Sequence, residues 1–323
     1  MTPAIAPQTL HRRAVVVDLH CDTVLEWFAG RRRLARRTRR GHIDLPRLQE
    51  GGVDVQVFAM YVAPAEARRG HARALELIDA FRREIAASSG HIAQATTVAE
   101  IASLVAAGRI AAVLAIESGD ALQGRAARLE EFARLGVRVL SLTWNNATAL
   151  GDGVLEEQYG GLTPLGRRVV RQMEEMGIVL DVSHLSRKAF WDAVKAGRGP
   201  FLATHSDAAA LCGHARNLDD AQLRAIADRG GVVGVNFYPD FLGEGTLPRV
   251  LDHVDHMARV MGIDHVGLGS DFDGIRSVPR GLEDASKMPA VTRGLLRRGY
   301  SARQIRKILG ENALRVFREV WGQ

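Results

Sequence analysis

Short apolar runs recur along the chain, and the segments between them place apolar residues three and four positions apart, as amphipathic helices do. Eight of these runs have the length and composition of buried strands. They span residues 15–19, 53–60, 110–116, 137–143, 178–182, 201–204, 232–237 and 266–268. Helical spacing is clearest in residues 72–87 and 164–176. The alternation of strands and helices predicts a parallel α/β fold.

Eight βα units is the number that closes a (β/α)8 TIM-like barrel, in which functional residues lie at the carboxyl ends of the strands. A doubly wound sheet is the alternative, and it would show a glycine-rich phosphate-binding turn after the first strand. That turn reads HCDTVLEW here and contains no glycine. Because no low-complexity linker or fixed-period repeat divides the chain, we expect residues 1–323 to form one barrel domain.

Composition narrows the class of protein without changing the fold prediction. Hydrophobic residues make up 46% of the chain and charged residues 25%, as in globular proteins. No apolar run approaches the length of a membrane span, and the N-terminus lacks the pattern of a signal peptide. Because Cys21 and Cys212 do not make a disulfide framework, we expect a cytoplasmic protein.

The chain carries a net charge of +6, and much of the excess lies in the arginine-rich segment Arg31–Arg40, RRRLARRTRR. One interpretation of this segment is a patch for nucleic acid or anionic lipid. No recognition motif or interleaved aromatic residue accompanies it, which favours a solvated loop or helix face. We therefore expect neither a nucleic-acid partner nor a membrane partner.

Residues that bind metals or move protons follow five of the eight runs. They are His20 and Asp22 after the first run, Glu117 after the third, His184 after the fifth, His205 after the sixth and Asp271 after the eighth. Side chains two apart on a strand project to the same side, so His20 and Asp22 can hold one ion together. Because the carboxyl ends of barrel strands meet at one rim, we expect all six groups to lie close together. Imidazoles and carboxylates suit Zn²⁺ or a similar divalent ion.

Five candidate ligands are too many for one tetrahedral catalytic zinc that keeps an open position. They suit two ions that share a carboxylate, and Glu117 is the natural bridge because its strand lies between the two ligand groups. Paired ions can share a hydroxide of lowered pKa, which is a nucleophile for hydrolysis. Asp18 and Asp181 are predicted to be supporting hydrogen-bonding groups.

Longer motifs make the chain similar to a known family. They are VDLHCD, AIESGD, GLTPLGRRVVRQMEEMGIVLDVSHLS, ATHSDAAALCGHARNLDD, GVVGVNFYPDF, VGLGSDFDG with GLEDASKMP, and ENALRVF. On these motifs the chain resembles the membrane (renal) dipeptidase family of binuclear zinc peptidases, as a bacterial-type member. The resemblance runs from about residue 14 to residue 318.

The resemblance implies a zinc-dependent dipeptidase with two ions per chain, in which a metal-bridging hydroxide attacks the peptide carbonyl. It also implies activity on L,D-dipeptides and a homodimer. In that family pattern His20 and Asp22 hold one zinc, His184 and His205 hold the other, and Glu117 bridges them. Asp271 matches the acid that handles protons at the scissile amide.

Two further positions match residues that contact the substrate in the family. Arg216 matches the arginine that binds the terminal carboxylate of the substrate, a role that suits its planar, charged fork. From the residues alone, a salt bridge with Asp219 or Asp220 is the simpler interpretation of Arg216. Tyr238 matches a substrate-contacting tyrosine, and a packed rim aromatic is the alternative.

One position departs from the mammalian-type members, which carry a substrate-contacting histidine where this chain has Trp144. The departure removes an imidazole that helps to polarise the substrate carbonyl, and some bacterial-type relatives share the tryptophan. We expect Asn145, Asn146 or a zinc ion to stabilise the developing oxyanion instead.

Two other classes of function stay open. A hydrolase of another small amide, a lactone or a phosphoester would use the same metal centre, although Glu117 and Arg216 favour a peptidase. A non-catalytic metal-binding scaffold is the third class, and the intact ligand set disfavours it.

Overall fold

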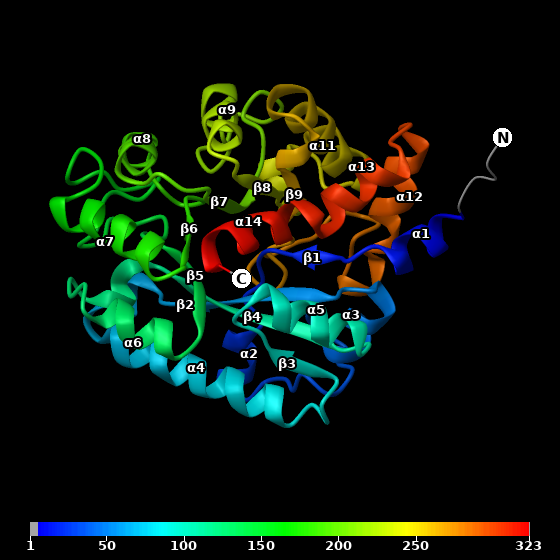
Figure 1. Ribbon diagram of the computed structural model, residues 1–323, viewed down its shortest axis with the longest axis horizontal. Helices are drawn as coiled ribbons and strands as arrows, with labels where there is room; N and C mark the ends of the chain where they lie inside the picture. Colours follow the sequence, from blue (N-terminus) through cyan, green and yellow to red (C-terminus); the bar gives the residue numbers. More distant parts are fainter. Residues whose placement is uncertain (1–5, 323) are drawn as a thin grey trace.

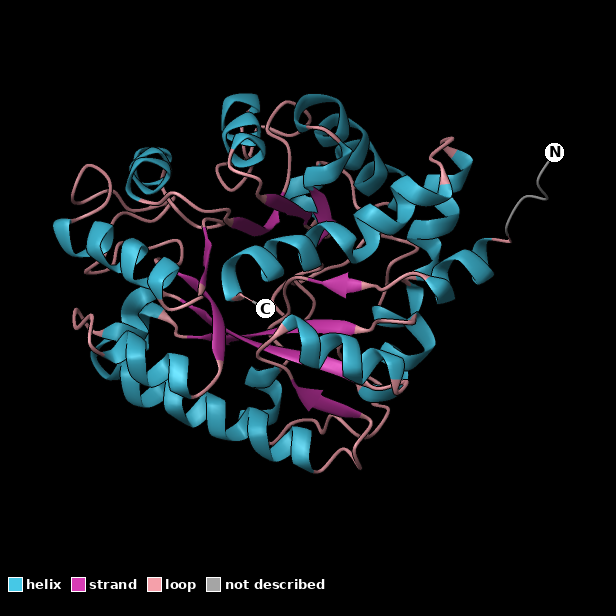
Figure 2. Cartoon of the chain, in the orientation of Figure 1, coloured by secondary structure: helices cyan, strands magenta, loops and turns pink. Residues whose placement is uncertain are grey.

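Eight parallel strands form the centre of the computed structural model, which describes residues 6–322 of the chain (Figures 1 and 2). They are β1 (Val17–Asp18), β2 (Val55–Tyr61), β4 (Ile110–Glu117), β5 (Val137–Ser141), β6 (Val179–Asp181), β7 (Leu202–Ser206), β8 (Val232–Val235) and β9 (Val266–Leu268). Each strand pairs with its neighbour in that order. The ring closes where the Leu19 N–H donates to the Leu268 carbonyl at 2.9 Å. The prediction of a TIM-like barrel is confirmed.

Helices surround the strands on the outside of the barrel (Figure 2). They are α1 (Pro7–Arg13), α2 (Val24–Phe28), α3 (Leu45–Gly51), α4 (Gly70–Ala86), α5 (Val98–Ala106), α6 (Arg128–Arg134), α7 (Pro164–Glu175), α8 (Arg187–Ala196), α9 (Asp220–Asp228), α10 (Pro239–Leu242), α11 (Leu247–Met261), α12 (Pro289–Arg297), α13 (Ala302–Arg306) and α14 (Asn312–Trp321). Their starts follow local chemistry, since Thr97 and Asp219 form capping boxes with Glu100 and Gln222. The helices expected over 72–87 and 164–176 are α4 and α7.

One strand was not predicted from the apolar pattern. The segment β3 (Ile92–Gln94) pairs in parallel with β4 alone and lies off the path of the ring. Its sequence, IAQ, has only three residues and ends in a polar side chain, so it carries too few apolar positions to register as a strand.

The interior of the barrel is packed with small and branched side chains from alternate strand positions, such as Val57, Val113 and Val179. The C-terminal helix α14 lies across the strands in Figure 1, and its Val316 and Phe317 join this interior cluster. Both side chains are fully buried. Because α14 covers the end of the barrel where the strands begin, the opposite end is left for a site.

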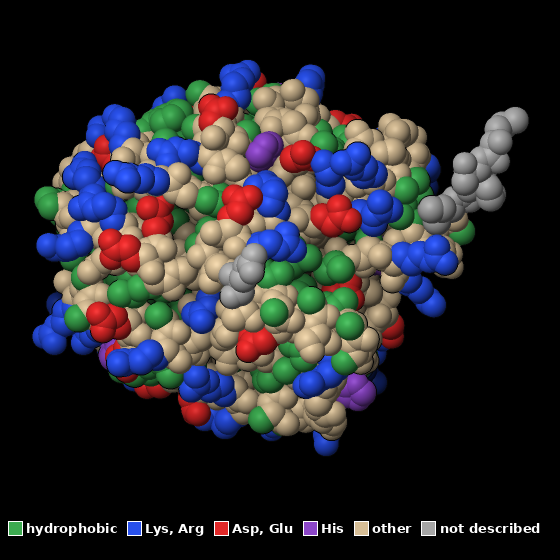
Figure 3. Space-filling model, viewed as in Figure 1, with side chains coloured by type: hydrophobic (Ala, Val, Ile, Leu, Met, Phe, Trp, Pro, Cys, Tyr) green, Lys and Arg blue, Asp and Glu red, His purple; other side chains and the backbone are tan. Residues whose placement is uncertain are grey.

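The arginine-rich segment is a loop, as expected, but it is not uniformly solvated. Arg32 is only 9% exposed, and its Nη2 lies 2.9 Å from the Asp273 carboxylate. Arg33 pairs with Glu84 at 2.6 Å, and Leu34 is buried. On the face in Figure 3, Lys and Arg side chains are interspersed with Asp and Glu. The expectation of a wholly solvated segment is therefore wrong at Arg32, which fastens the loop to the chain after β9.

The sequence predicts that the two cysteines form no disulfide framework and that no segment has the length of a membrane span. Cys21 and Cys212 are both free thiols, so the structure contains neither in a disulfide. Among residues 6–322, no helix combines the length and the apolar character that a membrane crossing requires.

Candidate metal centre and substrate cavity

The side chains predicted at the strand ends meet at the carboxyl end of the barrel. Glu117, the last residue of β4, lies between two groups of them. Its Oε1 is 2.8 Å from His184 Nε2, whereas its Oε2 is 3.4 Å from His20 Nε2. Asp22 Oδ2 is 3.5 Å from His20 Nε2, and His205 Nε2 is 2.9 Å from His184 Nε2. The two oxygens of Glu117 thus face two different pairs of donors.

The hydrogen bonds behind the histidines determine which ring nitrogens face the centre. His184 Nδ1 donates to Asn145 Oδ1 at 2.9 Å, and His205 Nδ1 donates to Thr204 Oγ1 at 2.8 Å. The Thr204 hydroxyl in turn donates to Asp181 at 2.8 Å. A proton on each Nδ1 leaves a lone pair on each Nε2, pointing inward. Arg216 Nη2 lies 3.3 Å from His184 Nε2, but the two lone pairs are only 2.9 Å apart, and a cation between them would relieve their repulsion.

Two buried atoms also point to a cation. Among the residues that the structure describes, His20 Nε2 and Asp22 Oδ1 have no hydrogen-bond partner. Burial and the charge of Glu117 raise the pKa of Asp22 to about 6. Burial lowers the pKa of His20, but Glu117 and Asp22 outweigh it and raise that pKa well above its usual value. Burial and Arg216 hold the pKa of His184 well below its usual value. The donor set therefore fits divalent metal, which satisfies crowded carboxylates and lone pairs together.

Asp18 and Asp181 are the supporting groups that the sequence predicts. Asp18 accepts hydrogen bonds from the backbone N–H (2.8 Å) and the hydroxyl (2.6 Å) of Ser270, which fixes the chain before Asp271. Asp181 accepts from Ser141, Ser183 and Thr204. Both carboxylates lie behind the centre rather than in it.

Asp271 faces the same centre from the chain after β9. One of its oxygens lies within 4.8 Å of ligand atoms of His20 and His205. Its Oδ2 accepts a hydrogen bond from Asn236 Nδ2 at 3.0 Å. Burial raises the pKa of Asp271 to about 7 against the opposing charge of His20, and the charges of Asp22 and Glu117 add to the rise. Asp271 is therefore held in place by Asn236 at the edge of the centre.

Gly274 lets the backbone pass close over two of these carboxylates. A Cβ at this position would lie 2.1 Å from Asp22 Oδ2 and 2.4 Å from Asp271 Oδ1. Only glycine fits such an approach.

Arg216 is buried beside the centre, with an exposed fraction of 3%. Its Nη1 donates to the Ser183 carbonyl and its Nη2 to the His205 carbonyl at 3.2 Å. The salt bridge with Asp219 or Asp220 is wrong, because Asp219 pairs with Arg187 and Asp220 with His256.

These side chains line a cavity of about 250 Å³. Trp144 and Tyr61 form one wall, with ring centroids 5.4 Å apart. Tyr238 lines the cavity and packs edge-on against Phe241, which confirms a packed rim aromatic and leaves its contact with substrate a prediction. The rest of the lining comprises Asp22, Leu25, Glu117, Asn145, His184, His205, Arg216, Phe241, Asp271, Asp273, Gly274, Ile275 and Arg276.

Asn145 and Asn146, which were expected to replace the missing histidine, differ in their position relative to the cavity. Asn145 lines the cavity, but its Oδ1 is engaged with His184. Asn146 Nδ2 donates to the Ala147 carbonyl and to Asp120, and Asn146 is not among the residues that line the cavity. Asn146 is therefore the wrong candidate for contact with substrate.

Sequence reasoning missed Asn236 and Arg276. Asn236 is a polar residue between Val235 and Phe237 at the end of β8, and this interruption of an apolar run was the signal for it. Arg276 carries no comparable signal, because a charged residue in a loop is ordinarily solvated.

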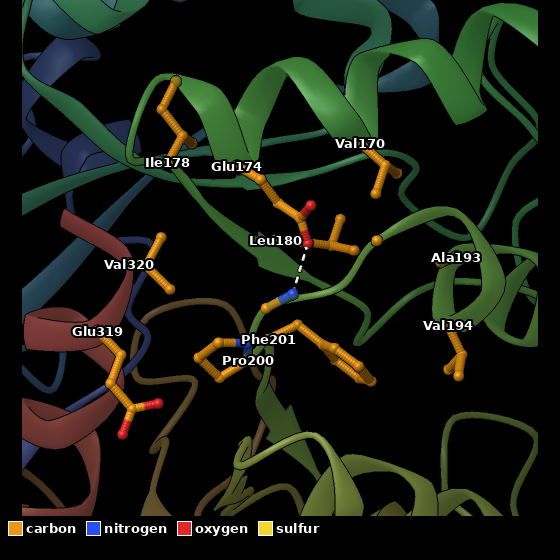
Figure 4. A pocket seen from close by; sticks show the side chains of 12 residues that line it. Val170, Glu174, Ile178, Leu180, Ala193, Val194, Pro200, Phe201, Glu319 and Val320 are labelled. Carbon is orange, nitrogen blue, oxygen red and sulfur yellow. Dashed lines mark hydrogen bonds between the residues drawn. The ribbon is translucent and has the colours of Figure 1, made fainter. Parts of the chain in front are cut away.

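A second hollow, of about 160 Å³, lies between α7, α8 and α14 (Figure 4). Its lining is mainly apolar, with Val170, Leu180 and Phe201 among the side chains drawn. Glu174 accepts a hydrogen bond from the Gly199 N–H at 2.8 Å, shown as the dashed line. The lining contains no histidine and no aspartate, so this hollow offers no counterpart to the metal-ligating cluster.

A parallel barrel that gathers histidines and carboxylates at the ends of its strands is typical of metal-dependent hydrolases. The family model described as membrane dipeptidase (peptidase family M19) matches residues 6–322. The chain therefore belongs to the membrane dipeptidase family, and it is a hydrolase of the dipeptidase class.

Individual relatives agree with this assignment. The dipeptidase tcpJ of Claviceps purpurea (strain 20.1) is 34% identical over 295 residues, which cover 87% of this chain and 69% of the relative. A metallopeptidase from Rhodobacter sphaeroides, solved with a phosphinate mimic of the dipeptide L-Ala-D-Ala, is 31% identical with a TM-score of 0.90. The match covers 95% of this chain and 99% of that one. The solved dipeptidase AC is 32% identical with a TM-score of 0.90, over 96% and 99% of the two chains.

Proposed function

We propose that the protein is a zinc-dependent dipeptidase with two zinc ions in each chain. Glu117 carries this proposal, because its two carboxylate oxygens face separate groups of donors and suit a bridge between two ions. In this arrangement His20 and Asp22 hold one zinc, and His184 and His205 hold the other.

The ions would supply a water of lowered pKa and a polarised carbonyl group. The chain's own residues would do the rest of the chemistry. Asp271 receives the proton of the attacking water at a carboxylate oxygen and delivers it to the nitrogen of the leaving amine. Asn236 keeps that carboxylate aimed at the centre.

Arg216 and Tyr238 would bind the C-terminal carboxylate of the dipeptide. Arg216 is buried at the floor of the cavity, where a guanidinium interacts strongly with an anion. Tyr238 lies at the start of α10 on the same wall as Phe241. A carboxylate held there places the peptide bond toward Glu117 and Asp271.

Trp144 would limit the space beside the peptide bond, since its ring lies 6.0 Å from that of His184 and lines the cavity. With no imidazole at this position, we assign polarisation of the carbonyl to the metal centre. We include L,D-dipeptides among the substrates, since a relative was solved with a mimic of L-Ala-D-Ala.

A panel of L,L- and L,D-dipeptides tests the proposal. Protein stripped with a chelator is expected to be inactive on the panel, and addition of Zn²⁺ is expected to restore hydrolysis and to load two ions per chain. Turnover of a lactone or phosphotriester with none of any dipeptide would overturn it. The homodimer and the cytoplasmic location stay predictions, and light scattering measures the first of them.

A further inference from the structure

The loop that follows β9 brings a second arginine to the cavity. Arg276 lines the same cavity as Arg216, but it is exposed rather than buried. Within residues 6–322 its guanidinium takes part in no hydrogen bond or ion pair. The neighbouring Arg32 is instead engaged with Asp273 at 2.9 Å. Arg276 is thus a charged fork that faces the cavity with its donors free.

The backbone that carries Arg276 is firmly attached to the barrel. Asp273 accepts hydrogen bonds from Thr23 Oγ1 and from the His42 N–H, both at 2.8 Å, and it pairs with Arg32. The close approach of Gly274 to Asp22 leaves the loop little room to shift. Arg276 therefore projects from a fixed point on the rim.

Tyr238 and Arg276 line the same cavity, and Tyr238 packs edge-on against Phe241, with the Arg216 guanidinium over the Phe241 ring at 5.4 Å. A hydrogen bond with Asp240 raises the pKa of the Tyr238 phenol, burial adds to the rise, and the positive charge of Arg276 opposes it. In the proposed orientation, Tyr238 and Arg216 hold the C-terminal residue of the substrate, so Arg276 faces the side chain of that residue.

We propose that Arg276 recognises a side-chain carboxylate on the C-terminal residue of the dipeptide, so that preferred substrates end in aspartate or glutamate. This inference rests on the proposed dipeptidase function. A guanidinium with free donors matches a carboxylate in charge and in planar geometry. Asp271, Asp22 and Glu117 line the inner cavity and disfavour an acidic side chain there. The rim beside Arg276 is the place where such a side chain gains an attractive contact.

Two isosteric substrates test the inference, Ala-Glu and Ala-Gln, in whichever C-terminal configuration the dipeptide panel shows to be hydrolysed. For the wild type we expect kcat/KM to favour Ala-Glu by about tenfold, mostly through KM, which corresponds to about 1.4 kcal/mol. Arg276→Gln should remove this preference, because kcat/KM for Ala-Glu falls by about tenfold more than kcat/KM for Ala-Gln. Arg276→Lys should keep part of it, because the charge stays but the fork is lost.

Arg280→Gln is the matched control, because Arg280 is exposed on the same loop and does not line this cavity. It should keep the full preference. A wild-type ratio near one, or a preference that survives in Arg276→Gln, overturns the role of Arg276 while the dipeptidase function stands. If Glu-Ala responds to the substitution and Ala-Glu does not, the assignment to the C-terminal residue is wrong. Failure of metal-loaded protein to cleave any dipeptide overturns both proposals.

Discussion

At the scale of single residues, Asp271 differs from the other carboxylates at the centre because an amide, Asn236, holds it. Asp271→Asn keeps the size of the side chain and removes the proton carrier. We expect kcat to fall by about 10²–10⁴-fold. Metal content should stay near that of the wild type, because the variant keeps all five proposed ligands, which are His20, Asp22, Glu117, His184 and His205. Elemental analysis beside steady-state kinetics measures both, and retained turnover would remove Asp271 from the chemistry.

Asn236 is expected to act on turnover through Asp271. Asn236→Leu removes the donor to the Asp271 carboxylate, and we expect kcat to fall by about 10–100-fold, as for loss of a hydrogen bond to a charged group. Asn312→Leu is the control, because Asn312 is also a buried amide but bonds the Ile263 and Val266 carbonyls far from the cavity. It should lower the melting temperature and leave kcat unchanged. Equal kcat values for the two variants would contradict the positioning role.

Asp54 gives a prediction about pH and stability. It accepts a hydrogen bond from the Val16 N–H at 2.8 Å, but burial dominates and raises its pKa to about 6. Since Asp54 ionises near pH 4 in the unfolded chain, the unfolding free energy should decrease as pH rises from about 4 to about 6, by up to roughly 3 kcal/mol. Asp54→Asn should flatten this part of the profile. Denaturant titrations at several pH values measure it, and an unchanged profile would contradict the assignment.

The residues of the centre differ in how far sequence could predict them. His20, Asp22 and Glu117 were predictable because each follows an apolar run, and strand ends meet in a barrel. Asn145 and Asn236 were not, because an amide makes its contribution only through the partner that folding brings to it. The burial of Arg32 was hidden for the same reason, since Asp273 lies at the other end of the chain.

At the scale of elements, the strands were predictable and their closure was not. Eight runs of branched apolar residues correspond to the eight barrel strands. Nothing in the pattern indicates that α14 covers the end of the barrel where the strands begin. The face of α14 that packs there looks like any amphipathic helix. Only the assembled barrel shows that Phe317 lies fully buried among strand residues, stacked on Trp321 with ring centroids 4.2 Å apart.

A substitution in α14 should separate stability from activity. Phe317→Ala leaves a cavity at the closed end of the barrel, and we expect the unfolding free energy to fall by about 3–5 kcal/mol. The folded fraction should keep near wild-type kcat, because the substrate cavity lies at the other end. Arg318→Ala, at an exposed position of the same helix, should change neither quantity. A large loss of kcat in folded Phe317→Ala would show that the two ends are coupled.

At the scale of the whole molecule, the proposed metal centre joins strands from both halves of the chain. Metal removal should therefore lower the stability of the whole fold. An ion that binds only the folded chain stabilises it by about 2.7 kcal/mol at a free concentration one hundred times its Kd. We therefore expect chelation to lower the melting temperature by about 5 °C or more. The His184→Ala/His205→Ala double variant should respond much less, and calorimetry with and without Zn²⁺ measures the difference. An equal response would contradict the assigned ligands.

The closure of the ring between Leu19 and Leu268 also determines when, during synthesis, the proposed metal centre can be completed. Asp271 is synthesised long after His20, and the two meet only when the first and last strands of the ring are side by side. A nascent chain therefore lacks a complete centre until β9 has been synthesised. The proposed hydrolysis of dipeptides can begin only once β9 has paired with the start of the barrel.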